Sequence, residues 1–281
     1  MKRAIRFLIR KSALVVSGFL PSARMRDEVR LWADGLNIRL FRTEIEAFIA
    51  EYPKVCREEE TLEKLIQDRS SIARFGDGEF KLIIGERHKS FQDVNEDLNA
   101  RMLGVLRSEH PNLFIAIHPV RDFDGLGRIW QKFIIRIGSQ VLGLLDKDRT
   151  YESTGVFHLL PENDEMAFKT RIRSIKRLWE KRKILIVVGK DSRFRFEPEL
   201  FDNVKSVDYV YGPAKNAFLE YDRLMDEVRQ WDRDDYLVLL VLGPTATVMA
   251  YDLAREGYQA IDFGQMPGKY IKAKKLLALG N

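Results

Sequence analysis

Residues 235–264 read DYLVLLVLGPTATVMAYDLAREGYQAIDFG, and this stretch decides the fold class. A continuous apolar run ends at Gly243-Pro244, a helical pattern follows with Gly257 at its end, and a second short apolar run closes at Asp262. An uninterrupted apolar strand followed by a helix and a second strand is typical of a parallel sheet that is buried on both faces.

The same alternation extends over most of the chain. Short apolar or β-branched runs occur at residues 71–76, 113–120, 183–189, 206–213, 235–243 and 259–264. Amphipathic helical patterns occur at residues 58–69, 93–108, 127–145, 164–181, 215–230, 246–256 and 269–279. This order predicts an α/β protein with a mostly parallel sheet and helices on both faces. In such sheets ligands bind beyond the carboxyl ends of the strands, so the polar residues that follow these runs are the candidate functional residues.

Composition and charge exclude several classes of protein. The chain has 281 residues, of which 45% are hydrophobic and 32% charged, as expected for a folded globular protein. The net charge of +5 comes from residues 1–30, which carry +6, so the remainder sums to −1 and does not indicate a nucleic-acid partner. Cys56 is the sole cysteine, which excludes an intrachain disulfide and favours a reducing, cytoplasmic compartment.

The N-terminus, MKRAIRFLIRKSALVVSGFLPSARMR (residues 1–26), combines basic and apolar residues. On a helical wheel its basic residues oppose one apolar face, formed by Ile5, Leu8, Ile9, Val16, Phe19 and Leu20. The apolar run is shorter than the roughly 20 residues of a spanning helix. A signal peptide and a helix packed on the protein itself are alternatives, but we expect a peripheral contact with the inner face of the plasma membrane. Residues 1–57 are predicted to form a helical N-terminal extension, and residues 58–281 the main domain.

Two carboxylates framed by glycines follow the first predicted strand, in SSIARFGDGEF (residues 70–80). Asp77 and Glu79 point apart in a helix but face the same side in an extended or turning chain. Gly76 and Gly78 let a ligand approach the backbone closely. Two hard carboxylate groups suit Mg²⁺ or Mn²⁺ rather than Zn²⁺. The alternative is a simple acidic turn, since Asp-Gly is common in turns.

Cations, an amide and hydroxyls follow the later strands. Lys190 and Arg193 follow the run at 183–189, and Asn216 follows the run at 206–213, where they are suited to bind phosphates and base edges of a nucleotide. Thr245 and Thr247 lie at a predicted helix start, which is a favourable seat for phosphate. Surface ion pairs and ordinary helix capping are the alternatives. The histidines lack zinc-binding spacing, and no G-x-G-x-x-G pattern is present.

Three segments together resemble the GT-D-type glycosyltransferase family: SIARFGDGEFKLIIGE, KILIVVGKDSRF and LGPTATVMAYDLAREGYQAIDFG. The resemblance covers about residues 60–265 and preserves the order of the segments. It implies a Rossmann-like fold, a D-x-E metal motif at Asp77 and Glu79, and dependence on Mn²⁺ or Mg²⁺. It also implies transfer of a sugar from a nucleotide-diphosphate donor such as a UDP-sugar to a glycan or lipid-linked glycan acceptor, in synthesis of surface polysaccharides or glycoproteins.

The resemblance for the D-x-E motif, and charge and strand-end position for the other residues, give the expected roles. The expected catalytic residues are Asp77, Glu79 and Arg193, of which the two carboxylates would hold the metal. The expected nucleotide-sugar-binding residues are Arg74, Gly76, Gly78, Lys190, Asn216, Thr245 and Thr247. Family members carry a histidine where this chain has Gln265. A nucleotide-sugar-binding protein with weakened catalysis is therefore one alternative; a nicotinamide-dependent oxidoreductase using Asp262 and a membrane scaffold are others.

Overall fold

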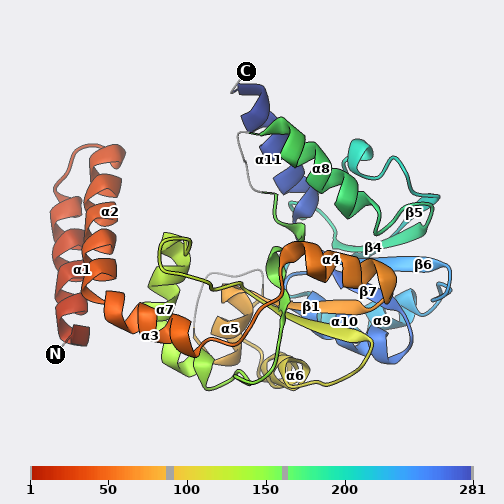
Figure 1. Ribbon diagram of the computed structural model, residues 1–281, viewed down its shortest axis with the longest axis horizontal. Helices are drawn as coiled ribbons and strands as arrows, with labels where there is room; N and C mark the ends of the chain where they lie inside the picture. Colours follow the sequence, from red (N-terminus) through yellow and green to blue (C-terminus); the bar gives the residue numbers. More distant parts are fainter. Residues whose placement is uncertain (1, 87–91, 160–163, 280–281) are drawn as a thin grey trace. The chain divides into compact units, whose positions relative to one another are not determined.

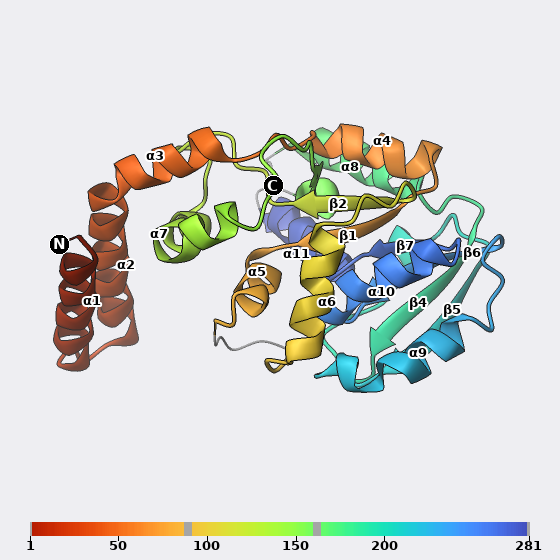
Figure 2. The same cartoon turned by 90° about the horizontal axis from the view of Figure 1, so that it is seen from below.

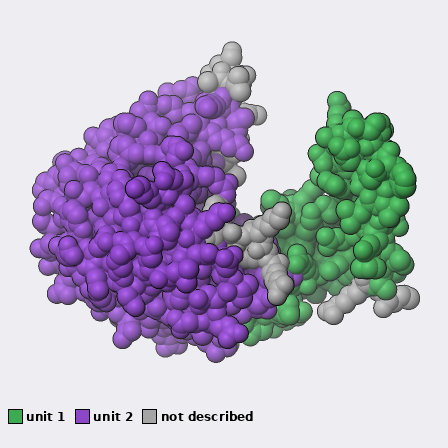
Figure 3. Space-filling model, turned by 180° about the vertical axis from the view of Figure 1, so that it is seen from behind, with its two compact units in different colours: residues 1–53, 120–148 green, residues 54–119, 149–281 purple. Residues whose placement is uncertain are grey.

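The structure is a computed structural model that describes residues 2–86, 92–159 and 164–279. The chain divides into two compact units, residues 1–53 with 120–148 and residues 54–119 with 149–281 (Figure 3). The second unit contains every residue that the sequence predicts to bind metal or nucleotide sugar.

Within the described residues, seven strands of the second unit form one parallel sheet in the order β3-β2-β1-β7-β6-β4-β5. The strands are β1 (Ser71–Phe75), β2 (Leu113–Ile117), β3 (Glu152–Ser153), β4 (Lys183–Gly189), β5 (Ser206–Gly212), β6 (Tyr236–Val241) and β7 (Gln259–Asp262). The continuous apolar runs became the central strands β4 and β6, which are buried along nearly their whole length. The predicted α/β class with a parallel sheet is confirmed.

Helices cover both faces of this sheet (Figures 1 and 2). One face carries α4 (Glu58–Gln67), α8 (Glu165–Lys176) and α11 (Met266–Leu279). The other carries α5 (Asp77–Ile83), α6 (Glu96–Leu106), α9 (Tyr221–Val228) and α10 (Pro244–Arg255). The core beneath the first group includes the buried rings of Trp179, Phe201 and Phe263, which pack against one another. These layers hold the strand ends, and the loops that follow them, in fixed positions.

The first unit is helical and consists of α1 (Lys2–Gly18), α2 (Ala23–Leu40), α3 (Arg42–Glu51) and α7 (Arg128–Leu142). Ala13 and Ser17 of α1 are buried. Phe48 of α3 packs so closely on α7 that a Cβ at Gly138 would lie 3.0 Å from its ring. Residues 120–148 therefore group with the N-terminal helices, an association that the sequence did not suggest.

Several elements differ from the sequence prediction at their ends. The N-terminal extension, predicted to be helical, divides at Phe41, where α2 ends and α3 begins. The last helix begins at Met266 rather than at residue 269. One strand and one α-helix of the described residues were not predicted: β3, which is too short to leave a pattern, and α5, whose start is hidden by two glycines.

Candidate functional site

The residues that follow β1 form the first turn of α5. Gly76 is the N-cap, and Asp77 and Glu79 are the first and third helical residues, with Gly78 between them. Glu79 Oε2 accepts a hydrogen bond of 2.9 Å from the Gly76 amide. Asp77 Oδ2 lies 2.5 Å from Lys81 Nζ, one helical turn further on. Because Asp77 and Glu79 lie two residues apart in a helix, their side chains leave the backbone in different directions, and each has its own partner. The extended or turning backbone that would place both carboxylates on one side is not what the structure has.

Arg74, near the end of β1, is bound to the last residue of the neighbouring strand β7. Its Nη2 lies 3.2 Å from Asp262 Oδ1, and its amide nitrogen lies 3.3 Å from Oδ2 of the same carboxylate. The Thr247 hydroxyl in α10 lies 3.4 Å from both Asp262 Oδ2 and the Arg74 carbonyl oxygen, which share its single proton. The Arg74 and Asp262 side chains are only 15% and 10% exposed. Two predicted residues, Arg74 and Thr247, thus meet around a third residue that the sequence had suggested only for a nicotinamide site.

The Arg74 guanidinium lies against a glycine and an aromatic ring. Gly264 has a φ of +60°, and a Cβ there would lie 2.5 Å from Arg74 Nη2, so the position needs glycine for its backbone angle and for the close approach. The guanidinium carbon lies 5.7 Å from the centre of the Phe157 ring. Arg74 Nε is buried and has no hydrogen-bond partner. One donor of this cation is therefore left unsatisfied inside the protein.

Burial and nearby charges shift the pKa values of the groups at this edge. Burial, and secondly the Asp262 charge, raises the pKa of the half-buried Glu79 carboxyl to about 7. Burial also raises the pKa of Asp262, although Arg74 opposes that change. Burial together with Arg74 lowers the pKa of Lys269 to about 8. Burial, Lys269 and Arg74 lower the pKa of His158 to about 4, so this imidazole is neutral at pH 7. Strong pKa shifts of this kind concentrate at functional sites.

The predicted cations after β4 lie apart from this cluster. Lys190 and Arg193 are exposed in the loop that follows β4. Two strands, β7 and β6, separate β4 from β1, which at the usual strand spacing places the two loops roughly 14 Å apart. That separation is comparable with the length of an extended nucleotide sugar, so the loops can contact opposite ends of one ligand.

The two remaining predicted residues are bound to the segment just before α6. Asn216 adopts a left-handed backbone (φ 54°, ψ 40°), accepts a hydrogen bond of 2.7 Å from the Asp93 amide and donates one of 2.8 Å to the Asp93 carboxylate. The buried Thr245 hydroxyl lies 3.5 Å from Gln92 Oε1. In this structure both side chains therefore connect loops within the protein.

Three residues at this edge were absent from the predicted site. Asp262 closes a strand, and the rule that placed the site at strand ends could have included it. His158 follows the short 3₁₀ helix Thr154–Phe157, and Lys269 lies one turn inside α11. No periodic signal identifies either, because the sequence does not fix which side of a short helix faces the sheet edge.

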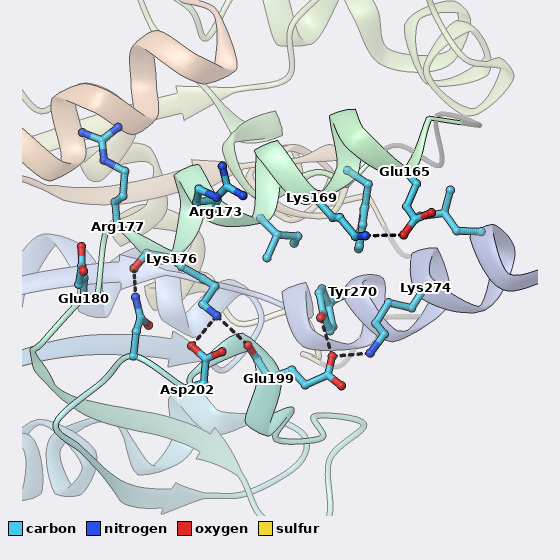
Figure 4. A pocket seen from close by; sticks show the side chains of 14 residues that line it. Glu165, Lys169, Arg173, Lys176, Arg177, Glu180, Glu199, Asp202, Tyr270 and Lys274 are labelled. Carbon is cyan, nitrogen blue, oxygen red and sulfur yellow. Dashed lines mark hydrogen bonds and ion pairs between the residues drawn. The ribbon is translucent and has the colours of Figure 1, made fainter.

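A cavity of about 750 Å³ lies between α8, α11 and the 3₁₀ helix Pro198–Leu200, apart from the predicted site residues. Its charged side chains are largely paired with one another (Figure 4). Glu199 accepts a hydrogen bond of 2.9 Å from the Tyr270 hydroxyl and also binds Lys274, while Lys176 pairs with Asp202 at 2.5 Å. None of the predicted site residues lines this cavity.

Asp77 and Glu79 fit a divalent metal by the chemistry of their donors. The described residues contain no cluster of three or more His, Cys, Asp or Glu side chains suited to a metal ion. Mg²⁺ and Mn²⁺ do not require one, because they bind through one or two carboxylates and complete their coordination with water and substrate oxygens. Asp77 is 43% exposed and therefore accessible to such an ion. The donor chemistry therefore suits Mg²⁺ or Mn²⁺, which can bind one carboxylate directly and another through water, and does not suit a structural zinc site.

Comparisons with known proteins agree with this architecture. The family model described as "Glycosyltransferase GT-D fold" matches residues 72–275. The chain is 31% identical over 221 residues to a Streptococcus gordonii protein named "Probable glycosyl transferase Gly" and 30% identical over 219 residues to glycosyltransferase GlyD of Streptococcus pneumoniae serotype 4. Each match covers 75% of this chain but only 32% and 26% of those proteins, so the chain spans about a third or less of their length.

A solved structure shares the fold over most of its length. It is described as showing that "the highly conserved domain of unknown function 1792 has a distinct glycosyltransferase fold". The two chains are 29% identical with a TM-score of 0.74, and the match covers 83% of this chain and 85% of the other. The sequence resemblance is thereby confirmed, and the chain belongs to the GT-D glycosyltransferase family.

Proposed function

We propose that this protein transfers a sugar from a UDP-sugar to a glycan or lipid-linked glycan acceptor, in surface polysaccharide or glycoprotein synthesis, with Mn²⁺ or Mg²⁺ as cofactor. The observation that carries the proposal is the position of the Asp77-Gly78-Glu79 turn. It begins α5 directly beyond β1, the strand that carries Arg74, whose partner Asp262 ends the neighbouring strand β7. Carboxylates and a cation at adjoining strand ends are what a metal and a diphosphate together require.

The residues of this chain would divide the work as follows. Asp77 and Glu79 would hold the metal, which when bound supplies positive charge where the leaving diphosphate becomes more negative. Arg74 would add positive charge beside the diphosphate, held in place by Asp262. Arg193 and Lys190, in the exposed loop after β4, would contact the far part of the donor. For metal binding, Asp77 must release Lys81 and Glu79 must lose its proton, and the loss of the Glu79 proton becomes easier above pH 7.

The structure does not favour the nicotinamide alternative. That reading needs Asp262 free to bind a ribose hydroxyl. Asp262 is buried and already bound to Arg74 and Thr247. Its role here is to position Arg74.

Isothermal titration of UDP-sugars with and without Mn²⁺, followed by mass spectrometry of released UDP, tests the function. Wild type should bind and turn over only with the metal, and Asp77→Asn should lose both properties. Asp97→Asn, which changes an exposed aspartate in the first turn of α6, is the matched control and should behave as wild type. Tight metal-dependent binding without turnover would instead support the alternative of a catalytically weakened nucleotide-sugar-binding protein.

We also propose that the protein works in the cytoplasm, at the inner face of the plasma membrane, with α1 in contact with the lipid. The described residues include no helix long and apolar enough to cross a membrane. Six large apolar side chains of α1 and its end are at least half exposed: Phe7, Leu8, Leu14, Val15, Val16 and Phe19. With the charge of +6 over residues 1–30, this surface suits anionic lipid.

The predicted apolar face of α1 is in part used within the protein, since Ile9 and Leu20 are half-buried. Co-sedimentation with vesicles tests the remaining surface. Phe19→Glu should reduce binding to vesicles rich in phosphatidylserine, whereas Leu219→Glu, at an equally exposed apolar side chain of the second unit, should not. Equal binding by both variants, or binding that ignores lipid charge, would contradict a membrane role for this surface.

A further inference from the structure

A further cavity, of about 540 Å³, lies between the start of α4, the 3₁₀ helix Thr154–Phe157 with the residues after it, and α8. Its size falls within the roughly 300 to 1,000 Å³ of small-molecule sites. None of the residues assigned above to the metal or the nucleotide sugar lines it. The lining combines carboxylates, an imidazole, hydroxyls and apolar groups, among them Glu58, Glu59, Asp164, His158, Thr170 and Phe168.

This α4–α8 cavity lies at the carboxyl edge of the sheet, where the metal-binding turn also begins. Glu58 Oε1, at the start of α4, accepts a hydrogen bond of 3.1 Å from the Ser153 hydroxyl at the end of β3. The Phe157 ring at the end of the 3₁₀ helix has its centre 5.7 Å from the guanidinium carbon of Arg74 in β1. His158, which lines the cavity, is the next residue. One wall of the cavity therefore stands beside the end of β1.

Contacts within the protein hold the walls of this cavity in place. A Cβ at Gly155 would lie 2.8 Å from Glu58 Oε1, so the 3₁₀ helix packs directly against the start of α4. Arg171 of α8 donates a hydrogen bond of 2.7 Å to the Val156 carbonyl in the same 3₁₀ helix. Its other terminal nitrogen lies 3.3 Å from Glu59 Oε1 in α4. The three elements are thus tied to one another around the cavity, which is formed without a ligand.

The charges on the lining oppose a phosphate and leave one polar side chain unused. The carboxylates of Glu58, Glu59 and Asp164 stand against one guanidinium, that of Arg171, a formal net charge of −2 with His158 neutral. An anion is repelled from such a cavity, whereas an uncharged ligand is not. His158 is exposed, and among the described residues its imidazole has no hydrogen-bond partner. A neutral imidazole offers one donor and one acceptor.

We propose that the α4–α8 cavity binds the acceptor as a neutral glycan, with the His158 imidazole hydrogen-bonded to a sugar hydroxyl. The inference rests on the proposed function, since an acceptor site has meaning only beside a donor site. Sugars present hydroxyl groups at their edges and C–H groups on their faces. The carboxylates and the imidazole suit the hydroxyls, while Leu159, Met166 and Phe168 offer apolar contact to the faces.

Carbon–proton NMR of the histidine side chains tests this site, with maltotriose, cellotriose and chitotriose as neutral probes. The chain has four histidines, and His158→Asn identifies the signal of His158. At least one trisaccharide should shift that signal saturably, and the shift should persist when UDP and Mg²⁺ are already bound. In competition titrations His158→Ala should weaken binding of the trisaccharide about two- to tenfold, the range for loss of one neutral hydrogen bond.

A variant that fills the cavity provides a second measurement. Ala167 is half-buried in α8 and lines the cavity, so Ala167→Phe should abolish the shift of the His158 signal. Lys169→Phe, which places the same ring in the cavity between α8 and α11, is the matched control and should leave the shift unchanged. Both variants should bind UDP with Mg²⁺ in calorimetry like wild type, and thermal unfolding checks that both are folded.

The outcomes separate this inference from the function on which it rests. If wild type binds UDP with Mg²⁺ but no trisaccharide shifts the His158 signal, the acceptor site is wrong and the proposed function stands. Displacement of the trisaccharide by UDP would assign the cavity to the donor and would also overturn the inference. So would loss of the shift in Lys169→Phe but not in Ala167→Phe, which would place the glycan between α8 and α11. If wild type binds neither UDP nor glycan, both proposals are overturned.

Discussion

Substitution of Gly264 by alanine should disable the Arg74 cluster, and its cost can be worked from the geometry. The φ of +60° places the new side chain in a left-handed backbone, which costs about 1 to 2 kcal/mol. The methyl group would lie 2.5 Å from Arg74 Nη2, so the guanidinium must withdraw by roughly 1 Å to reach a normal contact distance. That movement breaks its bond to Asp262, and a charge-assisted hydrogen bond contributes about 1.5 to 3 kcal/mol.

Gly257→Ala is the matched control, because its φ is +89° but its nearest neighbour, Arg233 Cδ, would lie at an ordinary 3.5 Å. In urea unfolding, Gly257→Ala should lose about 1 to 2 kcal/mol and Gly264→Ala roughly 2.5 to 5 kcal/mol. Affinity for UDP should fall at least tenfold in Gly264→Ala alone. Equal stability and equal UDP affinity in the two variants would refute the idea that Gly264 exists to admit Arg74.

Three further predictions follow from the same groups. The pKa of Glu79 is raised in the folded protein, so ionisation of Glu79 lowers the stability of the folded state as pH rises from about 4.5 through about 7. When unfolded in the presence of a chelator, Glu79→Gln should therefore be more stable than wild type by at most about 3 kcal/mol at pH 8, and equally stable below pH 4.5. A gain in stability that does not depend on pH would contradict this reading. Thr247→Val should lose about 1 kcal/mol in urea unfolding and weaken UDP binding, since Asp262 and the Arg74 carbonyl lose the one donor that they share; unchanged values for both would show that the hydroxyl is not needed. Asp77→Asn should change stability by less than about 1 kcal/mol, because its ion pair is partly exposed, yet abolish Mn²⁺ binding in calorimetry; retained binding would place the metal elsewhere.

The sequence predicted the sheet well because its strands are buried on both faces. Runs such as residues 183–189 are apolar throughout, and burial leaves such a segment few alternatives. The short edge strand β3 has two residues and leaves no such pattern. The start of α5 was obscured by Gly76 and Gly78, which are poor helix formers, whereas Glu79 at the third helical position stabilises the turn by capping it.

The site was predictable only in part. The strand-end rule located Arg74, Asp77 and Glu79, because that rule depends on topology alone. It could not show that Arg74 pairs with Asp262, which lies 188 residues away, since long-range partners have no local signature. The position of Lys269 was hidden for a related reason, because the rotation of α11 on the sheet is set by tertiary packing.

A crystal structure of the protein with UDP and Mn²⁺, with the metal located by anomalous scattering, tests the central claim most directly. The account predicts Mn²⁺ on the carboxylates of Asp77 and Glu79, with the diphosphate against Arg74. Metal bound away from both carboxylates, or UDP seated in the cavity between α8 and α11, would contradict it.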